Sequence, residues 1–87
     1  MKNYTQEDLF LNLVNQFQQS ASIYLGKIKN PQNNKIEKNL GLAVYFLNML
    51  RMLEEKTINN LTDNEAVNLK KIIKQIESDC NRELGSG

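Results

Sequence analysis

Apolar residues recur at every third or fourth position in three stretches of this chain, and that spacing predicts amphipathic helices. The stretches lie at residues 5–26, 39–57 and 62–83. Each of them has at least one apolar stripe, which is typical of helices that pack together around a core. The sequence therefore predicts an all-α fold, a three-helix antiparallel bundle formed by residues 1–84 as a single small domain.

The start of each predicted helix carries a residue suited to the N-cap. Thr5, Asn39 and Thr62 have side-chain oxygens that can accept a hydrogen bond from a free amide of the first turn. Glu65 follows Thr62 by three residues and completes the pattern of a capping box. Gly26 comes directly after the first apolar stripe, where a left-handed backbone would end the helix.

The apolar stripe of the first helix is predicted to face the core. Its members are Leu9, Phe10, Leu13, Val14, Phe17, Ala21, Tyr24 and Leu25. The opposite face carries amides and hydroxyls and is interpreted as a solvated surface. It consists of Asn12, Asn15, Gln16, Gln19 and Ser22.

Residues 27–38 separate the first two helices and do not follow a helical pattern. Pro31 lacks an amide hydrogen, and Asn33 and Asn34 favour a turn. Ile28 and Ile36 each lie between polar neighbours, which is typical of short half-buried strands. We therefore predict an irregular extended excursion that turns near residues 31–34.

Lysines make the excursion the most basic part of the chain. One interpretation is a solvated loop; the other is an electrostatic contact for phosphate or for an acidic protein. Lysines of the third helix would add to such a contact. The candidate residues for a partner or an anion are Lys27, Lys29, Lys35, Lys38, Lys70, Lys71 and Lys74.

Two apolar stripes run along the second helix. The first is predicted to join the core and consists of Ala43, Phe46, Leu47, Leu50 and Leu53. The second is predicted to mediate self-association and consists of Leu42, Tyr45, Met49 and Met52. A helix that is apolar on several sides must be covered on several sides. The sequence thus predicts a two-fold homodimer; the alternative is that the first and third helices wrap the second one completely.

The stretch that joins the second and third helices is interpreted as a structural corner. Lys56 suits the negative end of a helix dipole, and Asn59 or Asn60 can adopt the left-handed conformation that ends a helix. Arg51 lies four residues before Glu55 and could offset its charge. A functional alternative is that Glu54 or Glu55 reaches the amides that open the third helix. The corner comprises Glu54, Glu55, Lys56, Thr57, Asn59, Thr62 and Glu65.

Composition excludes several classes of function. The 87 residues carry a net charge of +1, with one cysteine and no histidine. Without histidine, acid–base catalysis near neutral pH lacks its usual group, and no metal, cofactor or catalytic residues are predicted. No membrane span and no signal peptide are evident, so a cytoplasmic location is expected. Cys80 falls on the apolar stripe of the third helix and is predicted to be a buried thiol. The final Gly-Ser-Gly, residues 85–87, is interpreted as a tail of the kind that cloning leaves.

Three short stretches of the chain resemble an uncharacterised bacterial family, the domain of unknown function 1844. They read LGKIKNP, NLGLA and MLRMLEEKTINNLTDNE, within residues 10–80. The last is the most specific, although many members of that family carry glycine where this chain has Asn59. The resemblance implies a small, mostly helical cytoplasmic protein and supplies no activity, substrate, cofactor or partner.

Two classes of function remain open from the sequence. The first is a small helical module for protein interaction or self-assembly, with a second copy or another protein as its partner. The alternative is an accessory protein that binds nucleic acid, RNA in particular, through the lysines of the excursion and of the third helix. The net charge near zero and the lack of an aromatic platform for stacking bases favour the first class.

Overall fold

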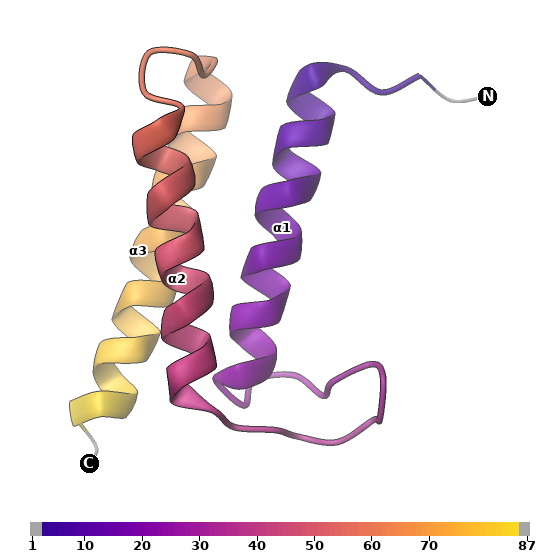
Figure 1. Cartoon of the computed structure of the whole chain (residues 1–87), viewed down its shortest axis with the longest axis vertical. Helices are drawn as coiled ribbons and strands as arrows, with labels where there is room; N and C mark the ends of the chain where they lie inside the picture. Colours follow the sequence, from indigo (N-terminus) through magenta and orange to yellow (C-terminus); the bar gives the residue numbers. More distant parts are fainter. Residues whose placement is uncertain (1–2, 86–87) are drawn as a thin grey trace.

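Three helices form the fold in the computed structural model, which describes residues 3–85. They are α1 (Gln6–Tyr24), α2 (Leu40–Lys56) and α3 (Asp63–Gly85). Successive helices run antiparallel, and each helix packs against both others (Figure 1). The all-α fold and the antiparallel three-helix bundle are therefore confirmed. Gly85, which we assigned to the tail, is the last residue of α3, and the other two tail residues lie outside the described part of the chain.

The predicted capping residues begin the helices as expected. Thr5 accepts a hydrogen bond from the Asp8 amide (3.0 Å), and the Asp8 carboxylate accepts one from the Thr5 amide (3.1 Å). Asn39 accepts a hydrogen bond from the Leu42 amide at 3.1 Å. After α1, Gly26 has a φ of +80°, which confirms the left-handed end of that helix.

The core lies where the three predicted stripes meet. It includes Cys80, so the prediction of a buried thiol is confirmed, and burial, together with the charge of Asp79, raises the pKa of this thiol. The aromatic rings of Phe17 and Tyr24 pack against that of Phe46 at the edge of the core. The buried core residues are Val14, Ala21, Leu25, Ala43, Leu47, Leu50, Leu69, Ile73, Ile76 and Cys80.

Two residues of the first stripe are not in the core. Leu9 and Leu13 are exposed, and Leu9 keeps 56% of its surface accessible. The stripe of α1 is wider than the side that α2 and α3 cover, so its outer edge remains in solvent. Conversely, the structure buries Ile23, which lies outside the stripe, because the excursion folds back over the last turn of α1.

The connection between α1 and α2 is non-helical and turns where predicted. Asn30 and Lys35 form an isolated antiparallel bridge, with a hydrogen bond of 2.8 Å from the Asn30 amide to the Lys35 carbonyl. The prediction of half-buried strands is wrong, since Ile28 and Ile36 are both exposed. Polar bonds hold the segment instead, including one from the Asn39 amide to the carbonyl of Tyr24 (2.8 Å).

Candidate functional site

The second apolar stripe of α2 lies largely outside the core. Tyr45 keeps 55% of its surface exposed, Leu42 and Met52 are also exposed, and Met49 is half-buried. Within the described chain, α1 and α3 thus leave uncovered the residues that the sequence assigned to self-association. The alternative in which these two helices wrap α2 completely does not fit this arrangement.

Leu9 and Leu13 extend this stripe onto α1. The ring centroids of Phe17 and Phe46 lie 6.2 Å apart and mark the side on which α1 and α2 meet. Leu13 precedes Phe17 by about one helical turn, and Met49 follows Phe46 by about one turn. Because the two helices are antiparallel, Leu13 and Met49 are displaced from the contact between Phe17 and Phe46 in the same direction, and they lie at about the same level of the two helices. We name the combined surface the uncharged face: Leu9, Leu13, Leu42, Tyr45, Met49 and Met52.

Five of the six residues of this face lie in sequence segments without a formal charge, and the sixth, Met52, directly follows Arg51. No acidic or basic residue lies between Asp8 and Lys27, or between Lys38 and Arg51. Charged residues instead concentrate in α3, at the ends of α1 and α2, and in the excursion. The uncharged face would therefore meet another surface with little charge to desolvate.

The seven candidate lysines do not act as one group. Lys27 forms an ion pair with Asp79, and Lys38 forms one with Glu83 at 2.5 Å, so two lysines of the excursion bind α3 of the same chain. Among residues 3–85, neither Lys29 nor Lys35 has a carboxylate within ion-pair distance. Lys27 and Lys38 therefore form ion pairs inside the fold, and this removes two of the phosphate contacts that the nucleic-acid hypothesis proposed.

Asp79 is a buried carboxylate beside Cys80 at the centre of a small polar network whose other members are exposed. Only 4% of Asp79 is exposed, and its carboxylate accepts hydrogen bonds from Lys27, from Gln75 at 3.3 Å and from Arg82 at 2.5 Å. Burial alone would raise the pKa of Asp79, but these hydrogen bonds and the two positive charges outweigh it, so the pKa lies below the usual 3.8. Gln75 and Arg82 lie on α3 within one turn of Asp79, whereas Lys27 is 52 residues away in the sequence, and no sequence signal pointed to that contact.

The backbone of the corner turns as predicted, but Arg51 forms its ion pair with a different residue from the one expected. Thr57 donates a hydrogen bond to the Leu53 carbonyl, and Asn59 takes the left-handed conformation with a φ of +67°. The side chains of Glu54 and Glu55 make no hydrogen bond or ion pair within residues 3–85, so neither reaches the amides that open α3.

Arg51 does not offset Glu55. It donates a hydrogen bond to Asn48 and forms an ion pair of 2.5 Å with Glu77 of α3. The i to i+4 pairing that the sequence suggested is therefore wrong, because α3 lies close enough to α2 to offer the guanidinium a better placed carboxylate. Lys56 is in the last turn of α2, as the dipole argument expected.

Thr62 connects the start of α3 to the first turn of α1. Its hydroxyl accepts a hydrogen bond from the Glu65 amide (3.1 Å) and donates one to Glu7 of α1 (2.8 Å). The Glu65 carboxylate accepts a hydrogen bond from the Thr62 amide at 2.8 Å, which confirms the capping box. The contact with Glu7 was not predicted.

Replacing Thr62 by alanine is expected to lower the free energy of unfolding by about 0.5–2 kcal/mol, because α3 loses its N-cap. Urea denaturation followed by circular dichroism would measure the change. Thr62→Ser keeps the hydroxyl and should retain most of the stability. If the serine and alanine variants were equally destabilised, the hydroxyl would not be the stabilising group.

A cavity of about 240 Å³ opens at the corner between α2 and α3. A second cavity of about 350 Å³ continues from it along α3, and Glu54 and Lys70 line both. The first cavity has a mostly aliphatic floor and a polar mouth. Its lining consists of Glu54, Thr57, Ile58, Asn59, Leu61, Ala66, Leu69 and Lys70. The second adds Ile73, Lys74 and Glu77.

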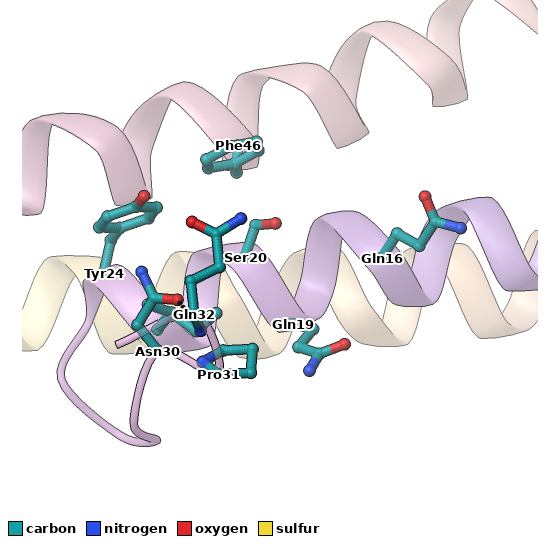
Figure 2. A pocket seen from close by; sticks show the side chains of 9 residues that line it. Gln16, Gln19, Ser20, Tyr24, Asn30, Pro31, Gln32 and Phe46 are labelled. Carbon is teal, nitrogen blue, oxygen red and sulfur yellow. Dashed lines mark hydrogen bonds between the residues drawn. The ribbon is translucent and has the colours of Figure 1, made fainter. Parts of the chain in front are cut away.

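An open cleft of about 350 Å³ lies on the other end of the molecule, between α1 and the excursion. Figure 2 shows the rings of Tyr24 and Phe46 along one side of it, and they stack with centroids 6.0 Å apart. Amides and a hydroxyl line the rest, from Gln16, Gln19, Ser20, Asn30 and Gln32. The sequence analysis placed Gln16 and Gln19 on a solvated face, and nothing in their spacing pointed to a cleft. Its lining holds no carboxylate or amine for acid–base chemistry.

Chemical groups for metal binding do not converge in the described chain. No three side chains among the histidines, cysteines, aspartates and glutamates of residues 3–85 lie close enough to share a metal ion. In the same range, no helix has the length and apolar character that a membrane crossing requires.

Comparison with known proteins gives one match. The model of a family described as a domain of unknown function (DUF1844) matches residues 7–79 of this chain. No curated protein and no solved structure matches it.

Proposed function

The chain belongs to the family of the domain of unknown function DUF1844, and from that premise we propose that it is a self-assembly module that forms a two-fold dimer through the uncharged face. The observation that carries this proposal is the exposure of five large apolar side chains of this face on two neighbouring helices: Leu9, Leu13, Leu42, Tyr45 and Met52. Contiguous apolar surface of this kind favours association in water.

A second copy suits this surface better than an arbitrary partner does. A two-fold axis places the same patch of both chains face to face, so any charge on the patch would approach a like charge. None of the six side chains that define the uncharged face carries a charge, so that repulsion does not arise among them. Tyr45, Met49 and Met52 are of the types that interfaces favour, since methionine adapts its shape to a partner.

The accessible area of the chain also supports dimerisation. A compact monomer of 10.1 kDa would expose about 5,300 Å², whereas this chain exposes 6224 Å². The excess is comparable with the roughly 800 Å² that each partner buries in an interface of standard size. The flat shape, with extents of 40 × 31 × 16 Å, explains why so much surface remains open.

Light scattering coupled to size-exclusion chromatography tests the dimer. We expect a dimer mass for the wild type at micromolar concentration, and a folded monomer for Met52→Lys and for Leu9→Lys. Each variant introduces one lysine into the uncharged face, which a two-fold axis would bring near a second lysine. Both side chains are exposed in the single chain, so circular dichroism should show unchanged helix content.

Ser78→Lys is the matched control, because it adds the same charge at an exposed position of α3. It should leave the dimer intact. A wild-type monomer mass across a wide range of concentration would refute the proposal. A dimer that Ser78→Lys breaks and Met52→Lys does not would place the interface on α3 instead.

A further inference from the structure

The corner cavity has the features of a docking site for a peptide, and they are independent of the uncharged face. Its floor is aliphatic, from Leu61, Ala66 and Leu69, and Ile58 stands at its rim with 67% of its surface exposed. A volume of about 240 Å³ holds one large apolar side chain. The cavity beside the turn that joins α2 to α3 can therefore receive an anchoring residue; that turn is at the top of Figure 1.

The charges beside the cavity are not used inside the fold. Within residues 3–85, the side chains of Glu54, Lys70 and Lys74 take part in no hydrogen bond or ion pair, although all three line the continuous pair of cavities. Glu77 also lines the second cavity, but Arg51 neutralises it. Two free ammonium groups against one free carboxylate leave this surface with a net positive charge.

From this combination we infer that the corner cavity and its continuation along α3 bind an acidic peptide segment of a partner protein. One large apolar side chain of the segment fills the cavity beside Ile58. Acidic side chains that follow it contact Lys70 and Lys74, which lie four residues apart on α3 and thus on one side of that helix. Glu54 disfavours an acidic residue directly at the mouth and so helps to set the position of the segment.

Nucleic acid fits the same surface less well. The described lining contains aliphatic side chains and no aromatic ring on which a base could stack. The carboxylate of Glu54 would also repel a phosphate backbone that approached Lys70. A peptide with an apolar anchor uses the floor of the cavity, whereas a phosphate chain would use only the two lysines.

The docking site stays accessible in the proposed dimer. Met52 and Glu54 are two residues apart on α2 and point about 200° from each other around the helix. The uncharged face and the corner cavity therefore lie on opposite sides of α2. The proposal of peptide binding and the proposal of a dimer can therefore be tested independently of each other.

A library of short random peptides displayed on phage, selected on the immobilised full chain, tests the inference. We expect the recovered peptides to combine a large apolar residue with nearby aspartates or glutamates. Affinity of a recovered peptide, measured by fluorescence anisotropy, should fall about fivefold or more in Lys70→Glu, because an attraction becomes a repulsion. Glu54→Gln should bind it more tightly than wild type.

Lys71→Glu is the matched control for charge, since Lys71 is exposed on α3 but does not line either cavity. It should change the affinity less than Lys70→Glu does. Amide chemical shifts in an NMR titration with the recovered peptide should change around residues 57–61 and 66–74. The inference is overturned if recovered peptides lack the apolar–acidic pattern, if Lys70→Glu and Lys71→Glu weaken binding equally, or if single-stranded RNA binds at Lys70 in place of any peptide.

Discussion

Replacing Asp79 by alanine is expected to lower the free energy of unfolding by about 1.5–3 kcal/mol, the range for hydrogen bonds to charged groups. The carboxylate is buried, and it accepts bonds from α3 itself and from Lys27 at the start of the excursion. Its loss would remove one of the two ion pairs that tie the excursion to α3 and leave Lys27 without its partner. Urea denaturation at equal protein concentration would measure the change. Glu77→Ala removes a half-exposed ion pair instead and should cost less than about 1 kcal/mol.

The stabilisation by Asp79 should also depend on pH. Because the pKa of Asp79 is lower in the folded chain than its usual 3.8, the ionised carboxylate stabilises the fold above about pH 4. This contribution is lost as the pH falls through the lowered pKa of the folded state. Asp79→Asn, which cannot ionise, should therefore differ most from wild type near neutral pH and converge toward it in acid. A difference that stayed constant from neutral to acid pH would contradict the role of the charge.

Replacing Leu50 by alanine should have the largest effect on stability, about 2–5 kcal/mol, because it leaves a cavity at the centre of the bundle. Leu50 is fully buried and belongs to the core that the three helices share. For a small domain such a loss is a large fraction of the total stability. Thermal and urea unfolding followed by circular dichroism would both measure it.

Leu84→Ala is the control for the same chemical change at an exposed site of α3. It should alter the free energy of unfolding by no more than about 0.5 kcal/mol. If Leu50→Ala were as mild as Leu84→Ala, Leu50 would not occupy the tightly packed centre that the fold places it in. The comparison also separates the effect of the core from any effect of leucine on helix propensity.

Local signals made the helices predictable. Asn39, Thr62 and Gly26 act within one turn of their own position, so their roles could be inferred without knowledge of the rest of the fold. The apolar stripes likewise gave the side of each helix that faces the core. Leu9 was misplaced because periodicity shows that a stripe exists but not how much of it the neighbouring helices cover.

Contacts between distant segments could not be predicted from the sequence. Lys27 binds Asp79 and Thr62 binds Glu7 across more than fifty residues, and no spacing along the chain connects these partners. The corner cavity is local in sequence, but its shape depends on how the end of α2, the turn and the start of α3 pack in space. Of the residues proposed for docking, Lys70 and Lys74 were recognised as possible contacts, while Ile58 gave no signal.

The opposite directions of Met52 and Glu54 on α2 have a consequence for affinity. Two chains that pair through the uncharged face would hold two corner cavities on one rigid body, related by the two-fold axis. A partner with two anchoring segments would make its second contact at the high effective concentration that the first contact creates. Such a partner would dissociate far more slowly from the dimer than from the Met52→Lys monomer, although each cavity remained unchanged. The strength of peptide binding would then depend on dimerisation, because α2 carries residues of both the uncharged face and the corner cavity.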